Sequence, residues 1–308
     1  MEIAAIQTRD LTKYYGAVVG VERLSLDIAR GEVFGFLGAN GAGKTTTIRM
    51  LLDFLRPTSG TASVLGFDCH TQGLDVRRRV GYLPAEMPVY PELTGAAYLK
   101  FLSALGPAPS PARMQSLLRR FDVSDVDLGR RMRDYSHGMK RKLGILQALM
   151  TDPEVLILDE PTSGLDPVMI EAFGETLDEL RRAGRTTVLL SSHILSEVDR
   201  VCSRIGLIRS GRLVAVQTLS ELRAATPRRL TVVFSQPVDV AAPAAPGWTL
   251  VTREPLRWVI DVRGPIGGFV AGLSGLPVAD IQIASFAIED ALLHFFSGRR
   301  DGAADTPS

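Results

Sequence analysis

The sequence predicts an α/β fold with a mainly parallel sheet, an inserted helical subdomain and a small C-terminal α+β domain. Short apolar runs at residues 32–37, 155–158 and 186–190 are typical of strands buried on both faces of a parallel sheet. Helical patterns separate these runs over roughly the first 220 residues, as in repeated βα units. The composition changes at about residues 85–150 and again after residue 226, which predicts the insertion and the second domain.

The elements follow in chain order. Residues 32–37 are expected to form a strand and residues 45–54 the helix that follows it, and residues 205–208 a strand that ends in a turn at Ser210-Gly211. The helical subdomain contains a Pro-rich break at residues 107–111. Its last helix has an apolar stripe that we expect to be core, because the members recur at helical spacing: Met139, Leu143, Leu146 and Met150.

Domain 1–225 is thus followed by a domain at 226–297, with strands expected at 230–235, 248–253 and 256–262. Residues 241–246 read as a loop and residues 288–296 as a terminal helix. The tail 298–308 is rich in Gly, Asp, Ser and Pro and is expected to be disordered.

Composition excludes several classes of protein. Lys and Arg number 35 against 34 Asp and Glu, so the charge of +1 does not indicate nucleic acid as a partner. The two cysteines, Cys69 and Cys202, lie far apart and favour neither a disulfide framework nor a zinc site. The start has no signal-peptide pattern, and no stretch approaches the ~18 to 20 apolar residues of a membrane span. We therefore expect a cytoplasmic chain that reaches a membrane only through a partner.

The segment between the first strand and its helix matches the pattern GxxxxGK[ST]. Its residues are Gly38, Ala39, Asn40, Gly41, Ala42, Gly43, Lys44 and Thr45. Glycines let backbone N–H groups turn toward phosphate oxygens, and the start of the helix adds its positive end. Lys44 would neutralise the β- and γ-phosphates, and Thr45 would bind Mg²⁺. A chance Gly-rich turn is disfavoured by the strand–loop–helix context, so a P-loop NTPase that binds a nucleotide triphosphate is predicted.

Asp159 and Glu160 directly follow the strand at 155–158. A carboxylate at this end of a parallel strand faces the crevice where ligands bind. Asp159 suits Mg²⁺, and Glu160 would polarise the attacking water, which distinguishes an ATPase from a nucleotide-dependent switch. Alone, such a pair is as often an ordinary turn, but the phosphate loop and the following Pro161-Thr162-Ser163-Gly164-Leu165-Asp166 favour the functional interpretation.

From about residue 5 to 222 the chain resembles the ABC ATPase family, in which these motifs occur in this order. Tyr15-Gly16 is similar to the aromatic loop that stacks on adenine, residues 163–166 to the D-loop, and Ser191-Ser192-His193 to the switch-histidine segment. The resemblance implies that His193 contacts the γ-phosphate. It implies a catalytic set of Glu160, His193 and Lys44, and extends the nucleotide-binding set to Thr46, Ser136 and Gly138.

The family signature usually reads LSGGQ, whereas this chain has Tyr135-Ser136-His137-Gly138-Met139. Ser136 can still cap the next helix, and its hydroxyl with the Gly138 N–H can meet a γ-phosphate. The Tyr-Ser-x-Gly-Met form resembles the ATPases of ABC-2-type exporters. The resemblance further implies a homodimer in which Ser136 of one subunit closes over ATP held by the other.

A second departure lies at residues 81–86, Gly-Tyr-Leu-Pro-Ala-Glu, where the family usually has a glutamine that helps to bind Mg²⁺ and senses the permease. Ala85 has no group for either task. We hypothesise that Glu86 substitutes for the glutamine through a shift of the loop by one residue. Full ATPase activity in the Glu86→Ala variant would disprove this hypothesis.

The resemblance therefore implies the ATP-hydrolysing subunit of an ABC transporter, an exporter of the drug, antibiotic or lipid type, which acts on a separately encoded ABC-2-type permease at the inner face of the membrane. One alternative is an ABC ATPase that acts on nucleic acid or ribosomes, a class with paired ATPase domains or coiled-coil insertions. Another is a small-molecule kinase or a GTPase, although the chain has no NKxD motif. The sequence leaves four roles open for the C-terminal domain: dimerisation, regulation of the cycle, contact with the permease, or added stability. Deletion of the residues after Ala225, with measurement of ATPase activity and dimerisation, would distinguish them.

Overall fold

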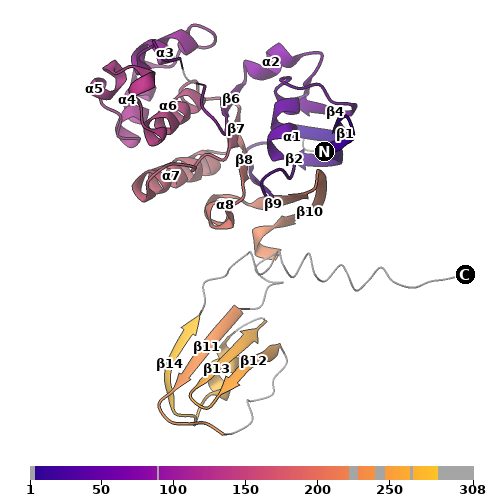
Figure 1. The fold of residues 1–308 in the computed structure, drawn as a ribbon, viewed down its shortest axis with the longest axis vertical. Helices are drawn as coiled ribbons and strands as arrows, with labels where there is room; N and C mark the ends of the chain where they lie inside the picture. The colour runs from indigo at the N-terminus through magenta and orange to yellow at the C-terminus, as the bar shows by residue number, and fades with distance from the viewer. Residues whose placement is uncertain (1–3, 89, 222–227, 240–246, 264–265, 284–308) are drawn as a thin grey trace, which may run out of the picture. The chain divides into compact units, whose positions relative to one another are not determined.

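The computed structural model describes residues 4–88, 90–221, 228–239, 247–263 and 266–283 (Figure 1). The chain divides into two compact units, Met1–Gln217 and Thr218–Ser308, which are described separately below. The expected domain boundary at residue 225 lies outside the described residues, as do the expected loop at 241–246, helix at 288–296 and tail at 298–308. Within the described part of the chain, no helix combines the length and apolarity needed to cross a membrane.

A six-stranded sheet forms the centre of the first unit. In spatial order its strands are β10 (Arg212–Thr218), β9 (Arg204–Arg209), β3 (Val33–Leu37), β8 (Thr187–Ser192), β7 (Val155–Asp159) and β6 (Val80–Leu83). The ladders that join β9, β3, β8, β7 and β6 are all parallel. Every residue of β3, β7 and β8 is buried, so the prediction of interior parallel strands is confirmed.

The register of the central strands places their carboxyl ends side by side. Leu37 at the end of β3 pairs with Ser192 of β8, and Asp159 at the end of β7 pairs with Ser191. Parallel strands end at the same edge of a sheet, and ligands of open α/β sheets bind beyond that edge. Three segments far apart in sequence, after β3, β7 and β8, therefore meet there.

A second, antiparallel sheet was not among the predicted elements. Its order is β2 (Val18–Ile28), β1 (Ile6–Tyr15), β4 (Ser59–Val64) and β5 (Phe67–Asp68). Register shifts within the β1–β2 ladder break the strict alternation of apolar and polar residues, which obscures the strand signal. Ile6 and Leu11 of this sheet share one core with Phe34, Phe36 and Ile48, so the two sheets pack as one domain.

The segment between β6 and β7 forms the expected helical subdomain. It contains α3 (Gly95–Ser103), α4 (Pro111–Arg120), α5 (Asp125–Gly129), a short 3-10 helix (Met132–Asp134) and α6 (His137–Leu149). In Figure 1 these helices group on the side of β6 and β7 away from β1 and β4. Leu143, Leu146 and Met150 of the predicted stripe are buried, and Met139 is half-buried.

The remaining helices of the first unit carry clear end signals. The helix α1 (Lys44–Leu51) ends three residues before the predicted limit of 54, because Leu52 leaves the helix and Asp53 adopts φ 57°. Short α2 (Gly73–Arg77) follows β5. The longer α7 (Pro167–Ala183) begins with Asp166 as its N-cap and ends at Gly184, and α8 (Leu195–Val201) follows β8.

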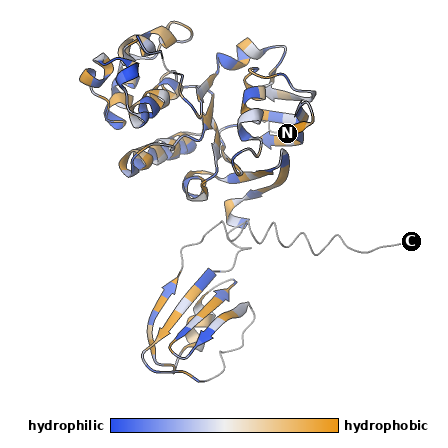
Figure 2. Ribbon diagram, viewed as in Figure 1, coloured by the Kyte–Doolittle hydropathy of each residue, from blue (hydrophilic) through white to orange (hydrophobic). Residues whose placement is uncertain are grey.

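The second unit contains an antiparallel sheet in the order β12 (Trp248–Glu254), β13 (Arg257–Val262), β11 (Arg228–Phe234) and β14 (Val278–Ile283). Helix α10 (Gly267–Gly272) contributes Phe269 to a core that also contains Trp258. Apolar and polar residues alternate along β11 and β13, as Figure 2 shows by colour, because one face of the sheet packs on this core. The strands predicted at 230–235, 248–253 and 256–262 correspond to β11, β12 and β13.

Candidate functional site

The loop at residues 38–43 joins the end of β3 to the start of α1. Gly43 precedes α1 with φ 111°, a conformation that favours glycine. A Cβ on Gly43 would lie 2.7 Å from the carbonyl oxygen of Gly20, and one on Gly38 would lie 2.4 Å from that of Ile208. Because glycine has no side chain to cap the helix, the first-turn N–H groups of α1 are open to an anion.

Lys44 holds the loop from within. Its side chain is 6% exposed, and Nζ donates hydrogen bonds to the carbonyl oxygens of Gly38 at 2.6 Å and Ala39 at 3.3 Å. Nζ also lies 3.1 Å from Oε1 of Glu160. The ammonium is thus in direct contact with both the phosphate loop and the carboxylate that follows β7.

Asp159 is fully buried at the end of β7. Thr45 Oγ1 donates a hydrogen bond of 2.8 Å to Oδ2 of Asp159, and Ser191 Oγ donates to Oδ1. A hydroxyl beside a carboxylate supplies the hard oxygen donors that Mg²⁺ prefers, with phosphate oxygens and waters to complete its octahedron. The residues present therefore fit Mg²⁺, and the expected pair of Thr45 and Asp159 lies together.

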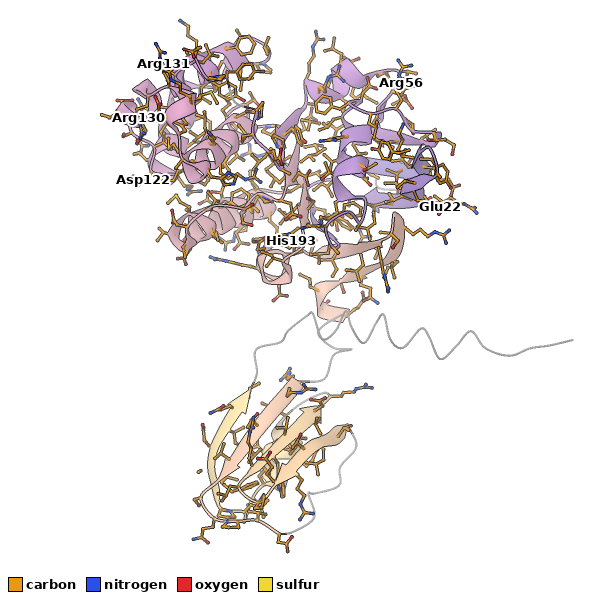
Figure 3. All side chains as sticks on the ribbon, in the orientation of Figure 1. Glu22, Arg56, Asp122, Arg130, Arg131 and His193 are labelled. Atoms are coloured by element: carbon orange, nitrogen blue, oxygen red, sulfur yellow. The ribbon has the colours of Figure 1, made fainter. Side chains whose placement is uncertain are left out.

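Glu160 and His193 meet although they follow different strands. His193 Nδ1 lies 2.7 Å from Oε2 of Glu160, whose other oxygen faces Lys44. The His193 side chain is 45% exposed and directly follows β8, and Figure 3 labels it in the lower part of the first unit. A carboxylate held between an ammonium and an imidazole can accept a proton from a water molecule beside the phosphate loop.

A cavity of about 380 Å³ lies over the loop. It is lined by Tyr15, Val18, Val19, Gly20, Asn40, Gly41, Ala42, Gly43, Lys44, Thr45, Thr46, Ala85 and Glu160. Tyr15 is 47% exposed and its ring lies near Gly20, so an aromatic side chain borders the cavity. The volume is in the range of small-molecule sites, and its polar groups are concentrated at the phosphate loop.

Comparison with known proteins agrees with this geometry. The ABC transporter family profile matches residues 21–163. The daunorubicin resistance ATP-binding protein DrrA3 of Streptomyces coeruleorubidus is 37% identical over 309 residues, which is 96% of each chain. The chain belongs to the ABC transporter family. It is an ATP-binding subunit that hydrolyses ATP.

Two further comparisons each cover about 70% of this chain. The bacitracin transport ATP-binding protein BcrA of Bacillus licheniformis is 37% identical over 209 residues, 68% of each chain. A solved ATP-binding subunit of an ABC transporter superposes with a TM-score of 0.66 at 32% identity, over 71% of this chain and 92% of that one. The P-loop NTPase fold predicted for this ABC ATPase is confirmed.

The signature residues of the ABC ATPase lie apart from this cavity. Ser136 is the N-cap of α6, where its Oγ accepts a hydrogen bond of 3.2 Å from Met139 N. A Cβ on Gly138 would lie 3.1 Å from the carbonyl oxygen of Gly164, so the start of α6 abuts the D-loop segment. Neither Ser136 nor Gly138 is among the described residues that line the cavity.

The loop after β6 contributes one residue to the cavity. Ala85 lines both this cavity and an adjacent one of about 320 Å³. Glu86 lines the adjacent cavity, together with Met87, His137, Lys140 and Arg141. The hypothesis that Glu86 replaces the family glutamine stays a prediction. Its side chain is placed beside the signature helix, next to the nucleotide site.

Sequence reasoning missed Arg141, a charged residue in α6 that is 2% exposed. Burial lowers its pKa to about 10, so the guanidinium is still protonated at neutral pH. A signal was present in the sequence, because Arg141 shares a helix face with Gly144, Ile145 and Ala148, which are all buried. A charge on such a face indicates a specific set of acceptors.

Glu197 in α8 was also missed. Thr162 Oγ1 donates a short hydrogen bond to its Oε1, and Ser192 Oγ donates to its Oε2 at 2.7 Å. Ser192 Oγ in turn accepts from the backbone N–H of Ile194 at 2.9 Å. Glu197 thereby links the segment after Glu160 to the segment that carries His193.

Proposed function

We propose that the cavity over the phosphate loop is the ATP site and that Glu160 activates the water that attacks the γ-phosphate. The observation that carries this proposal is the contact series Lys44–Glu160–His193, with separations of 3.1 Å and 2.7 Å. Glu160 accepts the proton of the water, His193 orients the carboxylate and contacts the γ-phosphate, and Lys44 stabilises charge on the β- and γ-phosphates. Tyr15 stacks on the adenine.

Thr45 and Asp159 would hold Mg²⁺ in this site. The bound ion supplies Lewis acidity and charge neutralisation at the phosphates. Thr45 and Asp159 already share a hydrogen bond of 2.8 Å, and Ser191 fixes the other carboxylate oxygen. The protein contributes the Thr45 hydroxyl and the Asp159 carboxylate oxygens, which these hydrogen bonds hold in a fixed orientation.

The decisive experiment is Glu160→Gln, which keeps the size of the side chain and removes the proton acceptor. We expect a fall in turnover of about 100-fold or more, because general base catalysis contributes about 10²- to 10⁴-fold. ATP binding persists, so an ATP-bound dimer accumulates and is detected by size-exclusion chromatography, with phosphate release measured in parallel. A monomeric Glu160→Gln variant that still hydrolyses ATP contradicts the proposal.

The working unit is proposed to be a homodimer in which Ser136 and Gly138 of one protomer close over ATP held by the other. This is supported by the position of both residues outside the cavity lining of their own chain, among the residues described. A twofold dimer would contain two such composite sites.

Mixing variants tests this arrangement. Lys44→Ala removes the phosphate ligand of a chain, and Ser136→Ala removes the hydroxyl that acts on the partner. Each variant alone is expected to be inactive, whereas a mixture contains dimers with one intact composite site and regains ATPase activity. Variants that fold and dimerise but gain nothing on mixing contradict the shared site.

The partner is proposed to be an ABC-2-type permease on a separate chain, with export of a drug-like or antibiotic molecule. This is supported by the Tyr-Ser-x-Gly-Met signature and by relatives named for daunorubicin resistance and bacitracin transport. The protein then occupies the cytoplasmic face of the membrane. To test this partner, the chain is expressed with and without the neighbouring permease gene, and membrane fractionation and drug-efflux assays follow. Cosedimentation of the chain with ribosomes in place of membranes would contradict the proposal.

A further inference from the structure

The backbone at Glu160 is strained. Its φ is 50°, in the left-handed region that non-glycine residues seldom adopt. Such a conformation persists only where the surrounding structure holds it, and it is characteristic of functional sites. The backbone N–H of Glu160 donates to the carbonyl oxygen of Ser191 at 3.1 Å, and its own carbonyl oxygen accepts from the Ser163 N–H at 3.2 Å and from Arg141 in α6.

Arg141 binds the strained turn through three successive carbonyl oxygens. Nη2 donates to the carbonyl oxygen of Asp159 at 2.8 Å and forms a short hydrogen bond to that of Glu160. Nε donates to the carbonyl oxygen of Pro161 at 2.9 Å. The side chain is 2% exposed, so protein carbonyls take the place of solvent around the guanidinium.

The third nitrogen of the same guanidinium faces the loop after β6. Nη1 donates to the carbonyl oxygens of Pro84 at 2.6 Å and Ala85 at 3.2 Å. Arg141 itself lies in α6, the helix that Ser136 caps. One planar group therefore joins the turn at Glu160, the loop at residues 84–85 and the signature helix.

We propose that Arg141 is a positioning residue for ATP hydrolysis, which holds the strained turn at Glu160 in register with the 84–85 loop and with α6. The proposal rests on the proposed function, in which Glu160 activates water. Ala85 has no side-chain group to connect its loop to the site, so the connection is made here through its backbone. A shift of α6, with Ser136 at its start, is thereby transmitted to the position of the Glu160 carboxylate.

The proposed role depends on the planar shape of the guanidinium and not only on its positive charge. The planar fork of arginine directs N–H groups in several fixed directions, whereas lysine offers a point charge on a flexible stem. Arg141→Lys retains the charge but cannot reach all of these carbonyls at once. The turn at Glu160 then relaxes while the phosphate loop, which Arg141 does not contact in the described structure, stays in place.

The test is steady-state ATPase kinetics of Arg141→Lys in the full chain. We expect kcat to fall by about 10- to 100-fold, since a misplacement of about 1 Å at a reacting group has effects of this size. KM for ATP is expected to change by less than about threefold, because the loop and Tyr15 are not affected. The melting temperature is measured first by circular dichroism, and assays are run well below it.

Arg113→Lys is the matched control. Arg113 also belongs to the helical subdomain and donates to a backbone carbonyl, that of Leu149 at 3.3 Å, but it lies on α4 and pairs with Asp152. The same chemical change there should leave kcat and KM within about twofold of the wild-type values, because the partners of Arg113 are Leu149 and Asp152 and not the turn at Glu160.

A folded Arg141→Lys variant with a wild-type kcat overturns the proposal, as does an equal loss in Arg113→Lys. If Arg141→Lys does not fold, Arg141→Gln is used, because its amide N–H groups can still donate to part of the buried set of carbonyl oxygens. Failure of both variants to fold shows a role in folding alone and also overturns it. The proposed function is judged separately by Glu160→Gln, whose activity does not depend on the outcome at Arg141.

Discussion

His193 Nδ1 lies 2.7 Å from Oε2 of Glu160 although the two residues follow different strands of the central sheet. The Glu160 side chain is 18% exposed and that of His193 is 45% exposed, so the imidazole lies on the solvent side of the carboxylate. Parallel pairing of β7 and β8 brings the two together, because Asp159 is opposite Ser191 in the register. In the proposed mechanism, this contact links proton acceptance at Glu160 to the segment that follows β8.

His193→Ala should therefore lower kcat by about 100-fold, within the range for loss of a group that assists proton transfer. KM for ATP should change by a smaller factor than kcat, because Lys44 and the phosphate loop, which line the cavity, still bind the phosphates. His193→Gln keeps one polar group near Glu160 and should retain more activity. Phosphate release is the measurement, with His70→Ala as the control, since His70 pairs with Asp53 elsewhere. Wild-type kcat in His193→Ala would show that the contact has no catalytic role.

Thr45 provides a test of the metal site. Thr45→Val keeps the shape of the side chain but loses the hydroxyl, which donates a hydrogen bond of 2.8 Å to Asp159. We expect the Mg²⁺ concentration for half-maximal ATPase activity to rise about tenfold, which corresponds to ~1.4 kcal/mol of binding free energy. Thr45→Ser restores the hydroxyl and should behave like the wild type. An unchanged Mg²⁺ titration in Thr45→Val would remove Thr45 from the metal site.

Tyr15 should contribute to ATP affinity through its ring and not through its hydroxyl. Tyr15→Ala is expected to raise KM for ATP about tenfold, because stacking of a base on an aromatic side chain is worth about 1–3 kcal/mol. Tyr15→Phe keeps the ring and should leave KM unchanged. Fluorescent-nucleotide binding measures both variants. Equal loss in the two variants would indicate that the hydroxyl, and not stacking, is the contact.

The two buried cysteines allow a test of the fold by thiol labelling at pH 8. Burial raises the pKa of the Cys69 thiol to about 12 and raises the pKa of Cys202 further above its ordinary range. At pH 8 the reactive thiolate of Cys69 is therefore only about one part in 10⁴ of the thiol, and thiol reagents should label neither residue in the native protein. Denaturant should expose both thiols together. Rapid labelling at pH 8 without denaturant would contradict their burial, 2% and 8% exposed.

Much of the phosphate-binding half of the site was accessible from the sequence. Gly38, Gly43 and Lys44 follow from a local pattern, because a short loop between a strand and a helix needs nothing else to form an anion site. Asp159 and Glu160 were also accessible, because an apolar run followed by acidic residues indicates the end of an interior strand. The antiparallel sheet was missed, since bulges between β1 and β2 disrupt its alternating pattern.

Contacts between distant segments were not accessible in this way. Arg141 reaches Pro84, 57 positions away, and Glu197 joins Thr162, 35 positions away, to the nearby Ser192. Nothing in the sequence around Arg141 or Glu197 specifies the distant partners. The end of α1 was placed too late, because the backbone of Asp53 turns to φ 57° through tertiary context.

The sequence by itself determined the P-loop and the carboxylates that follow β7, because each depends on short-range order along the chain. The ABC ATPase fold was implied by the resemblance of its motifs, in their order, to that family. Only the tertiary structure decided that Lys44, Glu160 and His193 form one contact series and that the Arg141 guanidinium binds three successive carbonyl oxygens of the turn at Glu160. The physical reason is strand register: β3, β7 and β8 align their carboxyl ends through hydrogen bonds that no local pattern encodes. Packing of α6 against that edge then places Arg141.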